Sequence, residues 1–123
     1  MTIKQLEREL LKKARERARL MDELDKLKTA QVLPALKKKY KGKYFIYDNG
    51  YNLEQRWPVY IYCHEVKSEY EAIVDAFELI PDEGWRIKIK KPEGLHLLQK
   101  EITRKEYEKN AHIAIAEIQK LLS

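Results

Sequence analysis

The sequence predicts an α+β protein with a small antiparallel β-sheet, or an SH3-like open barrel, of about five strands. A long N-terminal helix and a C-terminal helix flank that sheet. Apolar residues recur at helical spacing over the first 40 residues, alternate with polar ones from Lys43 onward, and return to helical spacing after Thr103. The length of 123 residues suits a single folded unit.

The N-terminal helix is predicted to begin after Thr2, which can cap it, and to run without glycine or proline to about Ala30. A heptad frame fits this helix, and six of its eight core positions are apolar. The eight positions are Ile3, Leu6, Leu10, Lys13, Arg17, Leu20, Leu24 and Leu27. Such a stripe must pack on something: the rest of the chain could cover part of it, and a second copy the remainder. We expect residues 1–41 to be a helical oligomerisation segment, with a break or kink near Pro34.

Residues 42–123 are expected to form the β domain together with the last helix. Its predicted strands cover residues 44–47, 57–66, 70–79, 85–90 and 95–99. Asn49 and Gly50 are turn residues after the first of these strands. Thr103 with Glu106 predicts a capping box, and so the start of the last helix. One broad buried face of that helix is predicted from Tyr107, Ala111, Ala114, Ile115, Ile118, Leu121 and Leu122.

Composition and motifs argue against an enzyme. The sequence contains no glycine-rich phosphate loop, dinucleotide fingerprint, zinc-protease motif or nucleophile elbow, and its only serines are Ser68 and Ser123. Cys63 and His64 are neighbours on a predicted strand, so they point to opposite faces, and Cys63 falls on the core side. We therefore expect no catalytic residue, metal or cofactor. One cysteine fits a reducing cytoplasm, and no apolar run reaches the ~20 residues of a membrane span.

The positive charge is concentrated near the N-terminus. Residues 1–43 carry a balance of +8 and residues 44–123 a balance of −3. Lysines of residues 37–43 are interleaved with Tyr40 and Tyr44, as in nucleic-acid interfaces, but the same lysines would also complement a helix C-terminus. The alternative function is therefore a basic inhibitor or a nucleic-acid- or protein-binding module, such as a blocker of a nuclease complex. A virion component that uses the N-terminal helix is a third interpretation.

Aromatic residues are dense in the predicted strands. The chain has eight tyrosines, two tryptophans and two phenylalanines, and seven of these rings fall within residues 44–62. Most are expected to fill a small β core, but strand alternation must leave some of them on the solvent side. Exposed rings near Arg56, Arg86 and Arg104 could stack on a nucleobase while the arginines hold phosphates.

Several segments together resemble a group of small phage proteins. They are residues 39–49, the Trp57-Pro58-Val59-Tyr60 run, Phe77-Glu78, residues 87–89 and residues 101–107. Within that group the pattern is most similar to the first described type of Thoeris anti-defence protein. The resemblance implies a non-enzymatic homo-oligomer in the host bacterial cytoplasm. Such proteins sequester a cyclic ADP-ribose-type immune signal, and some take up cyclic oligonucleotides.

The resemblance also implies site residues. Phe77 matches an aromatic position that stacks on the base, and Arg104 matches a phosphate-binding arginine at a helix N-terminus. Each has a structural alternative, Phe77 as a core residue and Arg104 as a solvated first-turn residue. The acidic turn at residues 81–84 departs from the family pattern. The predicted ligand-binding residues are Arg104, Phe77, Arg56, Trp57, Arg86, Asn49 and Tyr47.

Overall fold

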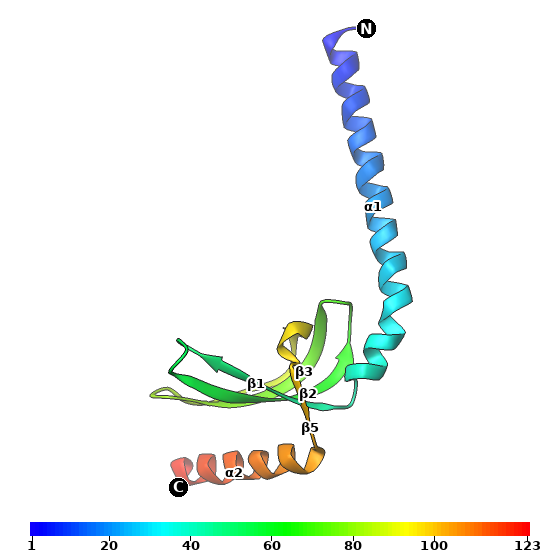
Figure 1. Cartoon of the computed structure of the whole chain (residues 1–123). Coiled ribbons are helices and arrows are strands. Elements are labelled where there is room, and N and C mark those ends of the chain that lie inside the picture. The colour runs from blue at the N-terminus through cyan, green and yellow to red at the C-terminus, as the bar shows by residue number, and fades with distance from the viewer.

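A computed structural model describes all residues of the chain, 1–123. The elements are α1 (Ile3–Tyr40), β1 (Tyr44–Gly50), β2 (Arg56–Val66), β3 (Glu71–Ile80), β4 (Gly84–Gly94), the 3₁₀-helix η1 (Leu95–Leu97), β5 (Lys100–Ile102) and α2 (Arg104–Leu122). The five strands form one antiparallel sheet in the order β4-β3-β2-β1-β5, which does not close into a barrel. The predicted α+β class, with helices flanking an open sheet, is confirmed (Figure 1).

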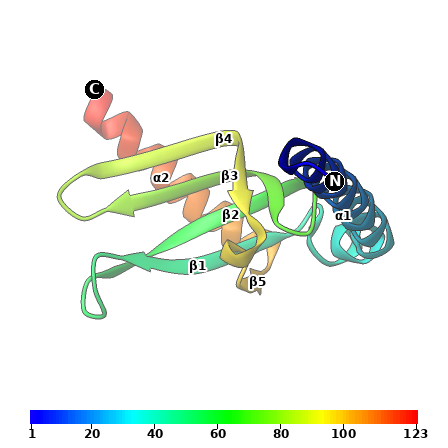
Figure 2. The ribbon, with the colours of Figure 1, turned by 90° about the horizontal axis from the view of Figure 1, so that it is seen from above.

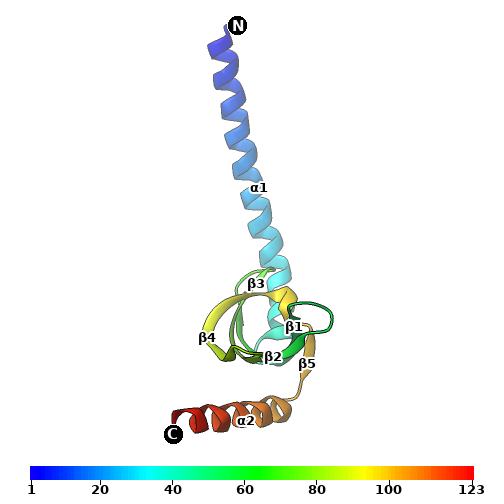
Figure 3. The ribbon, with the colours of Figure 1, turned by 90° about the vertical axis from the view of Figure 1, so that its left-hand side faces the viewer.

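Most of α1 extends away from the sheet (Figures 1 and 3). The helix begins where Thr2 predicts: the Thr2 hydroxyl accepts the Gln5 N–H at 3.2 Å, and the Gln5 side chain accepts the Thr2 N–H at 2.8 Å. No residue of α1 is buried, and its partly buried side chains Leu33, Leu36 and Tyr40 are the ones that pack against the core. Only the C-terminal turns of α1 are therefore anchored to the β domain.

The helix runs through Pro34 without the break that was one of the two predicted outcomes. Because proline has no N–H, the Ala30 carbonyl lacks its usual partner at this point. Figure 1 shows α1 changing direction in these last turns. Gly42 then turns the chain into β1 with a φ of 73°, and its N–H donates to the Cys63 carbonyl at 2.8 Å.

The sheet has two differently covered faces. One face packs against η1 and the end of α1 and is here called the η1 face; the other, the α2 face, lies against α2 (Figures 1 and 2). The core lies on the η1 face, where Val59, Ile61 and Cys63 alternate along β2 and Leu95 and Leu98 cover them. Cys63 is fully buried, as its position in the strand predicts.

Two predicted strand ends and one predicted strand are wrong. Asn49 and Gly50 belong to β1, because the hairpin pairing with β2 continues as far as Gly50 opposite Arg56. β4 runs past Pro92, which an edge strand tolerates because its outer side needs no N–H donor. The predicted strand at residues 95–99 is instead η1 and the turn after it, since burying both Leu95 and Leu98 needs a three-residue repeat. The fifth strand follows as β5.

α2 buries a narrower stripe than its apolar residues predict. Ala114 is buried, and three partly buried residues share its stripe at i, i+4, i+7 and i+11 spacing: Tyr107, Ala111 and Ile118. Ile115 lies to one side of this stripe and is exposed, and Leu121 and Leu122, in the last turn of α2, are exposed as well. Neither helix of the structure is long and apolar enough to cross a membrane.

Candidate functional site

The predicted ligand-binding residues are divided between the two faces of the sheet. Tyr47, Asn49, Trp57 and Arg86 belong to the η1 face, Arg56 lies at the β1–β2 loop, and Phe77 and Arg104 are on the side of α2. Residues directly opposite each other in antiparallel strands share a face. The structure therefore brings five of the seven residues to one side or one end of the sheet and separates the other two from them.

Strand register assembles the group on the η1 face. Asn49 pairs with Trp57, and Trp57 belongs to the buried cluster of that face. Across the sheet Arg86 of β4 pairs with Glu78 of β3. Tyr47 pairs with Val59, which in turn pairs with Glu78 on its other side. This register places a tyrosine, an amide, an indole, an arginine and a carboxylate on the same face of four adjacent strands.

Glu78 is the carboxylate of this group and the one charged residue among the buried positions, with 5% of its surface exposed. The Trp57 indole N–H donates to its Oε1 at 3.3 Å. Burial raises the pKa of the Tyr47 hydroxyl, the negative charges of Glu78 and Glu93 raise it further, and the positive charge of Arg86 opposes them. Tyr47, Glu78 and Arg86 thus share one electrostatic environment.

Arg86 is the free cation of the group. Its side chain is exposed, and it takes part in no ion pair of the structure. On the same strand Lys88 is engaged, since its Nζ lies 2.6 Å from Glu93 Oε1. Arg86 is therefore available to an anion from outside the chain.

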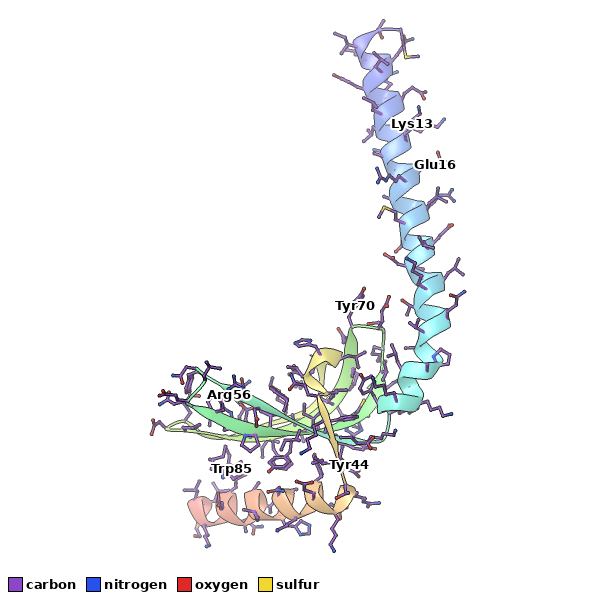
Figure 4. All side chains as sticks on the ribbon, viewed as in Figure 1. Lys13, Glu16, Tyr44, Arg56, Tyr70 and Trp85 are labelled. Carbon is purple, nitrogen blue, oxygen red and sulfur yellow. The ribbon has the colours of Figure 1, made fainter.

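A pocket of about 370 Å³ lies beside this group at the β1–β2 loop. It is lined by Asp48, Asn49, Gly50, Tyr51, Asn52, Leu53 and Arg56. The Asn52 side chain holds the loop by accepting the N–H groups of Glu54 and Gln55 at 2.8 and 2.9 Å. Tyr51 packs on Trp57 with ring centroids 5.0 Å apart. The loop thus joins Asn49 and Arg56 to the η1-face group; Figure 4 shows Arg56 at this end of the sheet.

Phe77 lies on the α2 face and is buried. Its ring stacks on Tyr60 at 5.1 Å and meets the Tyr107 ring of α2 edge-on at 5.3 Å. In this conformation the two rings that it contacts are protein side chains, which matches the alternative of a core residue. A ligand could stack on Phe77 only if α2 moved away.

Arg104 is the first residue of α2 and is exposed. Its Nε donates to Glu108 Oε1 at 2.7 Å, and this hydrogen bond with the Glu108 charge raises the pKa of the guanidinium. The arginine is thus charged but already paired within one turn of its own helix. It lies on the side of the sheet opposite the Tyr47–Arg86 group.

The sequence analysis did not predict two features of the candidate site. One is the buried carboxyl group of Glu78. The sequence pattern indicates its burial, because Glu78 falls in a two-residue alternation with Val74, Ala76 and Ile80, which are buried. The other is a cleft of about 330 Å³ between the sheet and α2. Its lining includes Tyr60, Leu79, Trp85, Ile113 and Glu117. In Figure 4 Trp85 lies between the sheet and α2; its indole N–H donates to Glu117 Oε2 at 3.2 Å.

No three His, Cys, Asp or Glu side chains come together as a metal ion would require. Comparison with protein-family models, curated proteins and solved structures gives no significant match. The fold and its surfaces define a class of protein only in structural terms: a small α+β chain with an open five-stranded sheet, a projecting helix, and an arginine, ring and amide group on one face.

Proposed function

We propose that this chain is a non-enzymatic phage anti-defence protein of the host bacterial cytoplasm that binds and sequesters a cyclic nucleotide-type immune signal. The signal would be a cyclic ADP-ribose isomer or a cyclic oligonucleotide, held between protomers of a homo-oligomer. The observation that carries the proposal is the unpaired Arg86 on the same face of the sheet as Tyr47, Trp57 and Asn49. This combination supplies a cation for a phosphate, rings for a base and an amide for its polar edge.

The charges restrict how such a ligand can lie. Glu78 and Glu93 repel an anion from the middle of the η1 face, so the phosphates belong at the outer end, between Arg86 and Arg56. The Asn49 side-chain oxygen already accepts the Gly50 N–H at 2.9 Å, which leaves the amide NH₂ for the base. One protomer offers an open surface here, and a second protomer would enclose the ligand.

Binding is tested with purified protein and cyclic ADP-ribose isomers. The protein is incubated with the compound, freed of excess and heat-denatured, and the released compound is identified by mass spectrometry. We expect intact ligand to be recovered and calorimetry to show binding. Absence of both binding and recovery, for the cyclic ADP-ribose isomers and for cyclic oligonucleotides, contradicts the proposal.

Single arginine variants identify the face that is used. Arg86→Ala removes a charge-assisted contact and should weaken binding by about 1.5–3 kcal/mol, or roughly 10- to 150-fold. Arg104→Ala tests the α2 side, and Arg15→Ala on the projecting part of α1 removes the same charge away from both faces. Loss of affinity in Arg104→Ala but not in Arg86→Ala would move the site to the α2 face.

A second candidate function rests on the lysines at the end of α1. Lys37, Lys38 and Lys39 occupy its last turn and take part in no ion pair, while Lys43 lies 3.4 Å from Glu101. Such a group could bind a polyanion and block a nuclease complex. Binding to a short DNA duplex should then weaken steeply as salt rises, through counterion release, and should be lost when the three lysines are replaced by alanine. An enclosed site for a small ligand depends less on salt.

A further inference from the structure

The projecting part of α1 leaves a row of large apolar side chains without any partner. Six of them are about half exposed or more: Ile3, Leu6, Leu10, Leu20, Leu24 and Leu27. They occupy the a and d positions of one heptad frame, so they form one continuous stripe along the helix. The frame ends at Leu27, because the next two core positions are Gln31 and Pro34. The stripe is thus confined to the part of α1 that the β domain leaves bare.

The centre of the stripe is charged. A depression of about 380 Å³ is lined by Lys13, Glu16, Arg17, Leu20, Met21 and Leu24. Figure 4 shows Lys13 and Glu16 on the same side of α1. Lys13 and Arg17 interrupt the apolar row at neighbouring d and a positions. A partner for this surface must therefore offer apolar side chains at both ends and a carboxylate at the centre.

A second copy of α1 offers this pattern when it lies parallel and in register. The g positions, Glu9, Glu16 and Glu23, then border the partner's e positions, which are Ala14, Met21 and Lys28. Glu23 would meet Lys28 of the other copy. An a-position side chain packs beside the preceding g residue of the facing helix, so Arg17 would meet Glu16. On either side of Lys13 and Arg17, each apolar a or d residue faces the same residue of the other copy.

An antiparallel pair would not satisfy the same charges. In that arrangement the g column of one helix faces the g column of the other, and every g position from Glu9 to Glu23 is a glutamate. Like charges along one edge destabilise the pair. The core cations do not distinguish the two arrangements, because Lys13 and Arg17 face each other in the antiparallel pair and face their own counterparts in the parallel pair; the glutamates of the g column do. Charge complementarity thus favours the parallel arrangement.

We infer that residues 3–27 of two copies form a parallel, in-register, two-stranded coiled coil. Two strands fit because Leu at most d positions and charged residues within the a/d core are typical of dimers, in which long charged side chains still reach water. The two β domains then lie at the same end of the coil, since both are anchored at the C-terminal turns of α1 (Figure 1). This inference concerns α1 alone and does not depend on the identity of any ligand.

Disulfide cross-linking of the full chain tests the orientation. With Ile3→Cys, a parallel pair brings the two new thiols together, so oxidation should yield a covalent dimer. Lys4→Cys is the matched control, because the next position faces outward in the same frame, and the native Cys63 is buried. An antiparallel pair would instead link Ile3→Cys to Leu27→Cys when the two variants are mixed. That result, or no cross-link with Ile3→Cys, overturns the inference.

The role of the charged layer is tested by sedimentation. The full chain should sediment as a dimer of the 14.7 kDa chain. Arg17→Leu fills a core position and should tighten self-association by about tenfold or more, whereas Arg15→Leu removes the same charge from the outer side and should leave it unchanged. A monomer at all concentrations, a trimer of the native chain, or equal effects of the two variants contradicts a dimeric coil in this frame.

Discussion

Trp57 donates its indole N–H to Glu78 across 3.3 Å, and this hydrogen bond is the only one that the buried carboxylate receives. Val74, Ala76 and Ile80 follow the same alternation along β3, so Glu78 stands among apolar side chains on the η1 face. A buried carboxylate without a donor is costly. The hydrogen bond gives one oxygen of this buried carboxyl group a donor and couples the predicted site residue Trp57 to the stability of the sheet.

Replacing the indole by a phenyl ring should therefore destabilise the protein. Trp57→Phe keeps an aromatic side chain but leaves Glu78 without its donor, which costs about 1–3 kcal/mol. The free energy of unfolding is measured in urea. The double variant Trp57→Phe/Glu78→Met removes the donor and the acceptor together, so its loss should be smaller than the sum of the two single losses. Strict additivity would show that the two side chains are not coupled.

Cys63 should be unreactive in the folded protein. Its thiol is fully buried, and burial raises its pKa to about 11, so almost no thiolate forms at neutral pH. Iodoacetamide at pH 8 should label the chain only as fast as the protein opens, and at once in denaturant. A cysteine placed at the exposed Lys4 provides the internal control. Rapid labelling of native Cys63 would mean that the η1 face opens locally.

Tyr107 should make the fold sensitive to alkali. Burial raises the pKa of its hydroxyl to about 12, with further contributions from Asp75, Tyr44 and Tyr62. The folded state favours the neutral phenol, so this stabilisation is complete below pH 10 and is lost as pH rises from about 10 to 12. Tyr107→Phe should flatten the decline of unfolding free energy in that window. Tyr70→Phe, at an exposed position, should leave the decline unchanged.

Local sequence patterns predict most of the fold but not its pairings. Thr2 and Thr103 give the starts of both helices, and alternation gives β2 and β3, because caps and strand periodicity depend on near neighbours. The extension of β1 to Gly50 depends instead on pairing with Arg56 across the hairpin. Turn residues alone cannot indicate where that pairing ends.

The candidate site likewise depends partly on local sequence patterns and partly on pairing between distant segments. Alternation in one strand puts Tyr47 and Asn49 on the same face, but the strand order that brings Arg86 to that face follows from pairing across three other strands. Phe77 is buried by Tyr107, which lies 30 residues further along the chain. No pattern around Phe77 distinguishes a ring that faces a ligand from a ring that faces a distant helix.

The two helix caps provide a matched pair of variants. Thr103 accepts the Glu106 N–H at 3.1 Å, and Thr2 accepts the Gln5 N–H at 3.2 Å, so Thr→Ala removes a similar hydrogen bond at each site. Thr103 starts a helix whose Tyr107 and Ala114 pack on the sheet, so its loss should cost the β domain about 1 kcal/mol. Thr2 lies at the end of α1 farthest from the sheet, and its loss should change β-domain stability by less than half as much while fraying the first turns of α1. Hydrogen exchange measured residue by residue distinguishes the two effects, and equal losses of protection in the sheet would contradict the separation of α1 from the β domain.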